Sequence, residues 1–203
     1  MKKILTLCIL LSLAWGVSAQ DNFKKYGVKS FIAKTQTTAG GQVTDGTLYV
    51  DDYGAFECDV KKMVIPGLIT YDYGVLTRKD RIWTFNIDEG KVQYKESPNP
   101  MPDLNFLDVT DEMAEKYEME DLGEEECMGK TCHKYSYVVL QGRKKVNWTV
   151  WAWKGIPMKY VIKQGRKEST VETVDLQLNA KIPDNILHLV DEVLLFIPKY
   201  RLS

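Results

Sequence analysis

The side chains that most often carry enzyme or metal chemistry are few in this 203-residue sequence. It contains two histidines, His133 and His188. His133 directly follows Cys132, and neighbours on a strand point to opposite faces, which argues against a cysteine–histidine nucleophile pair or a shared metal site. His188 lies in an apolar stretch, where we expect a packed histidine rather than a ligand. We therefore predict no catalytic residue, no metal site and no cofactor.

Acidic residues occur in short runs, including Asp51–Asp52 and Glu124–Glu126. Solvated ends of strands explain such runs best. No zinc-protease, nucleophile-elbow or phosphate-loop motif accompanies them. A hydrolase that uses an Asp or Glu at the mouth of a sheet is an alternative, which substitution of Asp72 would test.

The first 19 residues have the layout of a cleaved secretory signal. Lys2 and Lys3 precede a short apolar run, and Val17 and Ala19 are small residues at the −3 and −1 positions. The run is shorter than the roughly 20 residues that span a bilayer. We predict export to the periplasm or another bacterial envelope compartment, with cleavage after Ala19.

The remaining residues, 20–203, are predicted to form a single domain without a membrane-spanning segment. Without the two lysines of the signal, they carry 25 basic and 28 acidic side chains. Nucleic-acid binding depends on clustered positive charge, so this nearly balanced composition argues against a nucleic-acid partner.

Three cysteines follow the predicted cleavage site: Cys58, Cys127 and Cys132. In an oxidising compartment Cys127 and Cys132 are the natural disulfide, because the four residues between them resemble a hairpin turn. The alternatives are a redox pair, which the spacing disfavours because it is not C-x-x-C, and two free thiols. Cys58 alternates with Phe56 and Val60 on an apolar strand face, so we expect a buried, inert thiol.

The dominant periodicity of the sequence is two. Val174, Leu176 and Leu178 alternate with polar residues, and Trp83 and Phe85 follow the same pattern. This alternation favours antiparallel strands with one apolar face, and glycine-containing turns separate the runs. We predict strands near 26–38, 42–51, 54–62, 68–78, 81–88, 91–96, 120–127, 131–140, 144–154, 157–165 and 168–180.

The strand series is interrupted once, by Pro98, Pro100 and Pro102. Residues 97–109 are therefore expected to cross between two parts of the sheet. Thr110 is a suitable helix N-cap and acidic residues follow it, which predicts a short helix over 111–118. The apolar tail from Asp184 to Ile197 is expected to form a helix that covers an open edge or mouth of the sheet.

Large aromatic side chains occur on both faces of the predicted strand 144–154. Trp148 shares a face with Val146 and Val150, whereas Trp151 and Trp153 lie on the other face. Either both faces are covered by protein, or one face lines an apolar cavity, and both interpretations remain open. For a cavity, we predict these ligand-binding residues: Trp83, Trp148, Trp151, Trp153, Met158 and Tyr160.

Three segments of the C-terminal half occur in a familiar order. They are Gly129-Lys130-Thr131-Cys132-His133-Lys134-Tyr135, then Val150-Trp151-Ala152-Trp153-Lys154-Gly155-Ile156-Pro157-Met158-Lys159, then Asn179-Ala180-Lys181-Ile182-Pro183. Together they resemble a motif run of exported proteins related to the periplasmic lipoprotein carriers. Many proteins of that group have no assigned function. The resemblance covers about residues 120–187.

The resemblance implies a mainly β fold, in which a curved antiparallel sheet forms an incompletely closed barrel. The helix at about 111–118 and the C-terminal apolar segment would cover parts of this sheet. The carriers hold the acyl chains of lipoproteins in an apolar hollow on the concave side. The resemblance therefore implies a lipid or a lipidated protein as the partner.

Two functions fit these observations. The first is a non-enzymatic envelope protein that holds a lipid or a lipidated partner in an apolar hollow. The alternative is a structural or protein-interaction module whose core is filled by its own side chains and which has no small-molecule ligand. A hollow or a packed concave side would discriminate between them.

Overall fold

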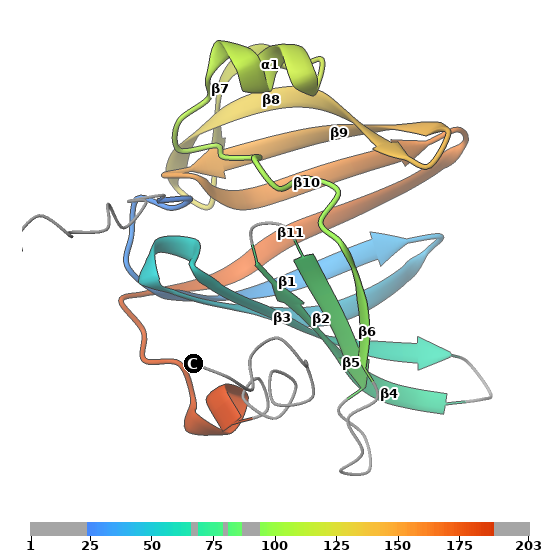
Figure 1. Ribbon diagram of the computed structural model, residues 1–203, viewed down its shortest axis with the longest axis vertical. Helices are drawn as coiled ribbons and strands as arrows, with labels where there is room; N and C mark the ends of the chain where they lie inside the picture. The colour runs from blue at the N-terminus through green and yellow to red at the C-terminus, as the bar shows by residue number, and fades with distance from the viewer. Residues whose placement is uncertain (1–23, 66–68, 79–80, 87–93, 189–203) are drawn as a thin grey trace, which may run out of the picture.

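Eleven antiparallel strands form one sheet in the computed structural model, which describes residues 24–65, 69–78, 81–86 and 94–188 (Figure 1). The predicted signal and the end of the predicted tail helix lie outside these residues. The strands are β1 (Phe31–Ala39), β2 (Gln42–Asp51), β3 (Phe56–Ile65), β4 (Ile69–Thr77), β5 (Arg81–Asn86), β6 (Tyr94–Pro98), β7 (Glu120–Cys127), β8 (Lys130–Gln141), β9 (Lys144–Trp153), β10 (Ile156–Gln164) and β11 (Lys167–Leu178).

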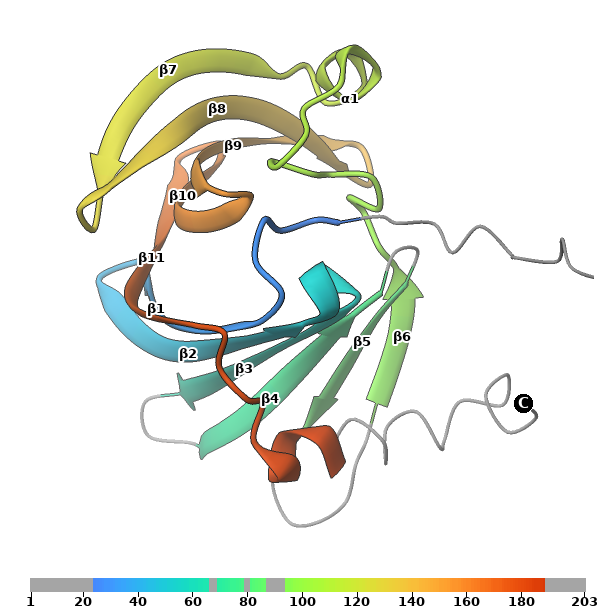
Figure 2. The same ribbon diagram turned by 90° about the vertical axis from the view of Figure 1, so that its left-hand side faces the viewer.

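The sheet is a meander whose first and last strands are neighbours. Its order is β6-β5-β4-β3-β2-β1-β11-β10-β9-β8-β7, and each pair is antiparallel. The sheet bends strongly, so that β7–β10 lie opposite β2–β6 (Figure 2). It does not close into a barrel, since β6 and β7 stand at its two ends. The predicted incompletely closed barrel is confirmed.

One segment joins the two ends of the sheet. Residues 99–110 run from β6, across the mouth of the bend, to helix α1 (Asp111–Lys116) (Figures 1 and 2). Thr110 is the N-cap of α1, and its hydroxyl oxygen accepts a hydrogen bond from the Met113 amide at 3.2 Å. The predicted crossover and the predicted helix are both present, although α1 is two residues shorter than expected.

The predicted strands are all present, but the first begins later than expected. Residues 24–30 are irregular because their backbone bonds to other loops. The amides of Lys25 and Tyr26 donate to the Tyr53 carbonyl, at 3.0 and 3.2 Å, and the Gly27 amide donates to the Lys154 carbonyl at 2.9 Å. Tyr53 belongs to the short helix η1 (Asp52–Gly54). The N-terminal segment therefore lies inside the bend of the sheet (Figure 2).

The predicted alternation in β11 is wrong at Val174, where a bulge interrupts the strand. The register with β1 shifts between Lys34 and Thr35, which leaves Val174 opposite no residue. Val174 is accordingly 49% exposed and does not share a continuous buried face with Leu176. Because side chains alternate with a period of two, one extra residue reverses every later side chain of a strand.

The outer, convex face carries a core of its own. Cys58, Leu76, Trp83 and Phe85 are buried on the β3–β5 part of this face, together with Ile182 and Ile186 of the C-terminal segment. Residues 184–188 form a helical turn there. The described start of the tail, residues 184–188, thus packs on an outer face rather than at the predicted edge or mouth.

The prediction that His188 is packed is wrong, because the side chain is exposed. In an α-helix, positions i and i+2 lie about 200° apart around the helix axis, so a turn that buries Ile186 directs the side chain of His188 away from the core.

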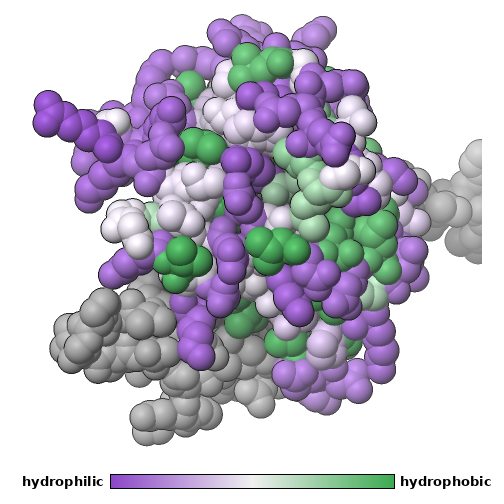
Figure 3. Space-filling model, turned by 180° about the vertical axis from the view of Figure 1, so that it is seen from behind, coloured by the Kyte–Doolittle hydropathy of each residue, from purple (hydrophilic) through white to green (hydrophobic). Residues whose placement is uncertain are grey.

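Seen from behind, the surface intersperses hydrophobic residues among hydrophilic ones (Figure 3). None of the helices in the described ranges is both long and apolar enough to cross a bilayer.

Candidate ligand-binding cavity

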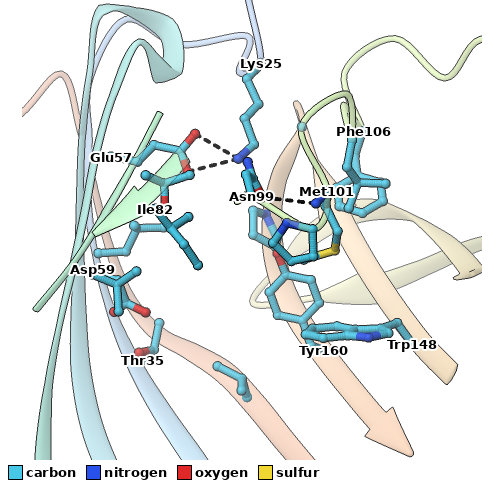
Figure 4. A pocket seen from close by; sticks show the side chains of 18 of the residues that line it. Lys25, Thr35, Glu57, Asp59, Ile82, Asn99, Met101, Phe106, Trp148 and Tyr160 are labelled. Carbon is cyan, nitrogen blue, oxygen red and sulfur yellow. Dashed lines mark hydrogen bonds and ion pairs between the residues drawn. The ribbon is translucent and has the colours of Figure 1, made fainter. Parts of the chain in front are cut away.

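The concave side of the sheet is only partly filled. A cavity of about 420 Å³ remains between β3 and the strands β8–β10, and we call it the inner cavity (Figure 4). Its volume falls in the range of about 300–1,000 Å³ that is typical of small-molecule sites. The lining residues are Lys25, Tyr26, Thr35, Leu48, Glu57, Asp59, Lys61, Val75, Thr77, Ile82, Asn99, Pro100, Met101, Leu104, Phe106, Tyr137, Trp148, Gly155, Pro157, Tyr160, Ile162, Val171 and Thr173.

Aromatic rings form one wall of the inner cavity. Tyr137 of β8 and Trp148 of β9 are cross-strand partners whose rings stack at 5.9 Å. Tyr160 of β10 meets Trp148 edge-on at 5.6 Å, and Phe106 lies 5.6 Å from Tyr137. These four residues are the aromatic wall. Burial raises the pKa of Tyr137 and of Tyr160, so both phenols stay protonated at neutral pH.

Charged residues form the opposite wall. Glu57, Asp59 and Lys61 occupy alternate positions of β3, so all three side chains point to the concave side. The Lys61 amine lies 2.8 Å from Asp59 Oδ2. Burial opposes the positive charge of Lys61, but the nearby Asp59 carboxylate outweighs it and raises the pKa of Lys61. With Lys25, these residues are the polar wall.

Lys25 connects the polar wall to the N-terminal segment 24–30. Its amine donates hydrogen bonds of 2.8 and 2.9 Å to both oxygens of Glu57, whose side chain is only 10% exposed. The next residue, Tyr26, is buried and packs edge-on against Phe31 at 5.0 Å. The ion pair between Lys25 and Glu57 offsets the cost of burying the Glu57 carboxylate.

The crossing segment 99–110 closes the mouth of the inner cavity. The Asn99 side chain donates to the Arg78 carbonyl at 3.3 Å and accepts from the Met101 amide at 3.0 Å. The Asn105 side chain donates to the Lys24 carbonyl at 3.1 Å and accepts from the Leu107 amide at 3.0 Å. These bonds fix the turns that direct Met101, Leu104 and Phe106 toward the cavity.

Three polar atoms in the walls lack a hydrogen-bond partner within the described part of the chain. They are Asp59 Oδ1, the Tyr137 hydroxyl and the Trp148 indole nitrogen, and all three are shielded from solvent. Buried polar groups in folded proteins are nearly always paired. These three atoms border the inner cavity and are available to a ligand or a water molecule in it, whereas Trp83 Nε1, the Tyr117 hydroxyl and Trp151 Nε1 are also unpaired among the described residues but do not line the cavity.

Two of the predicted ligand-binding residues, Trp148 and Tyr160, line the inner cavity. Trp83 lies in the outer core with Cys58, and Met158 is buried in a cluster that includes Tyr26, so neither is among the lining residues. The structure therefore brings Trp148 and Tyr160 together with aromatic neighbours and leaves Trp83 on the other side of the sheet.

Trp151 and Trp153 alternate with the inward-facing Trp148, Val150 and Ala152, so they lie on the outer face. Trp151 is buried in the same cluster as Cys132 and Met158, and lysines lie over both indole rings. Lys134 lies 4.6 Å and Lys159 5.4 Å from the Trp151 ring, and Lys130 lies 4.3 Å from the Trp153 ring. These are cation–π contacts that stabilise the outer face.

Sequence reasoning missed the polar wall. Phe56, Cys58 and Val60 identified the apolar face of β3, and the alternating Glu57, Asp59 and Lys61 had the pattern of a solvated face. The opposite charges of Asp59 and Lys61 at i and i+2 on one strand face were the available signal, but a solvated strand face carries charged residues in the same alternation. Only the bend of the sheet places this face inside.

Cys127 and Cys132 are free thiols in the structure, so the predicted disulfide is not formed there. In the β7–β8 register Cys127 is opposite Lys130 and Cys132 is opposite Glu125, and a hydrogen bond between the two thiols contributes to the pKa of each. The two cysteines are diagonal rather than directly opposed. Burial, together with the neighbouring Cys127, raises the pKa of Cys132 to about 12.

Within the residues that the structure describes, no group of three or more His, Cys, Asp or Glu side chains is placed to hold a metal ion. His133 is exposed and lies 3.4 Å from Glu124, its cross-strand partner. Cys132, by contrast, is fully buried. The expectation that these neighbours point to opposite faces is confirmed.

No family model and no curated protein sequence matches the chain. Solved structures that resemble it include a LolA superfamily protein from Nitrosomonas europaea, with 12% identity and a TM-score of 0.36 over 79% of this chain and 90% of that one. Another is the structure of a putative outer membrane lipoprotein-sorting protein domain from Vibrio parahaemolyticus, with 12% identity and a TM-score of 0.39 over 80% of this chain and 91% of that one.

Two further structures are LprF from Mycobacterium bovis and MucB of Pseudomonas aeruginosa in complex with MucA. LprF has 12% identity and a TM-score of 0.39, over 78% of this chain and 90% of LprF. The MucA/MucB structure has 10% identity and a TM-score of 0.36, over 78% of this chain and 54% of the matched chain. The chain thus spans about half the length of that protein.

Proposed function

We propose that this protein is a non-enzymatic binding protein of the bacterial envelope that holds a lipid, or the lipid part of a lipidated partner, in the inner cavity. The observation that carries this proposal is the unfilled concave side of the sheet, of about 420 Å³. It supports binding over the alternative of a core filled entirely by the protein's own side chains. The predicted signal over residues 1–19 supports an exported location.

The composition of the cavity wall suits an acyl chain. Met101, Leu104 and Ile162 join the aromatic wall around the space. Each methylene group moved from water into such surroundings contributes about 0.8 kcal/mol. A chain of ordinary length would therefore bind without any catalytic group.

The size of the cavity suggests one chain rather than several. The N-terminal segment 24–30 and the crossing segment 99–110 already occupy much of the concave side (Figure 2). The remaining volume lies in the lower half of the usual range for ligand sites. A single-chain lipid fits this description better than a multiply acylated one.

Native mass spectrometry of the protein purified from a bacterial envelope tests the proposal. We expect a population whose mass exceeds that of the chain by one lipid. Repeated recovery of the ligand-free mass alone would contradict the proposal.

A pair of substitutions on β11 makes this test specific. Val171 lines the inner cavity opposite Tyr160, so Val171→Phe places a ring in the space that the lipid needs. Val174, three residues away, is half exposed outside the cavity, and Val174→Phe is the matched control. We expect the lipid-bound fraction to fall at least several-fold in Val171→Phe and to stay unchanged in Val174→Phe. Equal lipid content in both variants would place the lipid elsewhere.

A further inference from the structure

The polar wall is electrically balanced. Lys25 pairs with Glu57 and Lys61 pairs with Asp59, so two positive and two negative charges neutralise one another. Each pair is partly buried, with side-chain exposures between 10% and 27%. The wall therefore offers no net charge to a ligand.

One acceptor of this balanced wall is left over. Asp59 uses Oδ2 for Lys61, whereas Oδ1 is shielded from solvent and has no partner in the residues that the structure describes. Asp59 projects from β3 toward the space that Tyr160 and Met101 border from the other side (Figure 4). A ligand lying against the aromatic wall would thus present its polar end to Asp59.

The aromatic wall adds two unpaired groups. The Trp148 indole nitrogen is a donor, and the Tyr137 hydroxyl can donate or accept. Tyr137 is only 1% exposed, so bulk water does not supply its partner. An occupant that carries both hydrogen-bond donors and acceptors would satisfy all three atoms.

Charge decides which polar group fits. An anionic head finds both lysines of the wall already paired, so it would have to displace Glu57 or Asp59 from its lysine and leave that carboxylate partly buried without its partner. An ammonium head would compete with Lys61 for the same carboxylate. A hydroxyl or amide N–H donates to Asp59 Oδ1 without disturbing either ion pair.

We propose that the inner cavity selects a single-chain amphiphile whose uncharged head carries a hydroxyl or amide donor for Asp59. This inference rests on the proposed lipid-binding function and narrows it to one chemical class. Asp59 accepts the donor of the head, the Trp148 indole nitrogen and the Tyr137 hydroxyl bond to the other polar atoms of the head, and Met101, Leu104 and Ile162 contact the chain.

Three ligands with the same chain length and different heads test this proposal: monomyristoylglycerol, myristate and tetradecylamine. Isothermal titration calorimetry on the purified protein, freed of endogenous lipid and with each ligand below its micelle concentration, gives the three dissociation constants. We expect monomyristoylglycerol to bind about tenfold tighter than the two charged ligands, as one charge-assisted hydrogen bond allows. Binding of myristate or tetradecylamine with equal or higher affinity overturns the head-group selection but leaves lipid binding intact. Binding of none of the three overturns the proposed function itself.

Substitution of Asp59 adds an independent measurement. Asp59→Asn removes the carboxylate charge and leaves Lys61 without its partner, so the preference should shift toward myristate, and monomyristoylglycerol should lose most of its tenfold advantage. Asp175→Asn is the matched control, because Asp175 pairs with Lys34 at 3.7 Å outside the inner cavity. An Asp59→Asn variant that folds, by circular dichroism, and keeps the original preference contradicts the role of Asp59. If that variant does not fold, the ligand series on the unsubstituted protein decides alone.

Discussion

At the scale of single residues, burial controls the chemistry of the cysteines. Cys58 and Cys132 are fully buried. Burial, with the nearby Asp59, raises the pKa of Cys58 to about 12, and the pKa of Cys132 is about as high. Because the thiolate is the reactive form, these thiols are poor nucleophiles at neutral pH. This supports the prediction that Cys58 is an inert thiol.

The raised pKa of Cys58 predicts a loss of stability at high pH. The unfolded thiol ionises near its ordinary pKa of 9.0, whereas the folded thiol stays protonated to about 12. Between these values the unfolded state binds fewer protons, so the free energy of unfolding falls as the pH rises through this window. Below pH 9 the contribution of Cys58 is complete and constant.

Urea denaturation at about pH 8 and about pH 10 measures this effect. Between these two pH values we expect the free energy of unfolding to fall less in the Cys58→Ala variant than in the unsubstituted protein, because the variant lacks the titration of Cys58. Some decrease should remain, because Cys132 and the buried tyrosines still titrate. An identical decrease in both proteins would show that Cys58 is not perturbed by its surroundings.

At the scale of elements, two glycine turns determine how the N-terminal segment enters the sheet. Gly155, in the β9–β10 turn, has a φ of +79°, and a Cβ there would lie 2.5 Å from the Lys25 carbonyl oxygen. Gly54, with a φ of +100°, would place a Cβ 2.9 Å from Lys25. The segment therefore depends on a close backbone approach that only glycine permits.

We expect Gly155→Ala to cost about 1 kcal/mol for the left-handed backbone and a further 1–3 kcal/mol for the overlap with Lys25. Gly165→Ala is the control, because Gly165 has a φ of +61° in the β10–β11 turn and an added Cβ would meet nothing within 4 Å. Denaturant unfolding of both variants measures the difference. Equal losses would show that the N-terminal segment does not dock against this turn.

The elements were largely predictable from the sequence, because strand alternation and turn glycines are local signals. The bulge at Val174 was not, since an unpaired residue depends on the register with β1 rather than on β11 alone. Residues 26–30 have strand-like composition, but the amides of Tyr26 and Gly27 bond to the carbonyls of Tyr53 and Lys154, which lie far away in the sequence. Local patterns do not contain such long-range contacts.

At the scale of the whole molecule, the bend of the sheet decides which faces are internal. Alternation places Trp148 and Trp151 on opposite faces, but it does not say which face is concave. The structure puts Trp148 at the inner cavity and Trp151 under lysines on the outside. For the same reason the strand pattern alone places Asp59 and Lys61 on a solvent-facing side, whereas the bend of the sheet places them at the inner cavity.

The central claim is that the space between the aromatic and polar walls belongs to a bound lipid. A crystal structure of the protein, purified from a bacterial envelope without delipidation, tests this claim most directly. The predicted result is continuous elongated density in the inner cavity, with its polar end between Asp59 and the Trp148 indole nitrogen and its chain against Met101, Leu104 and Ile162. A cavity closed by the protein's own side chains, or filled with ordered water alone, would contradict it.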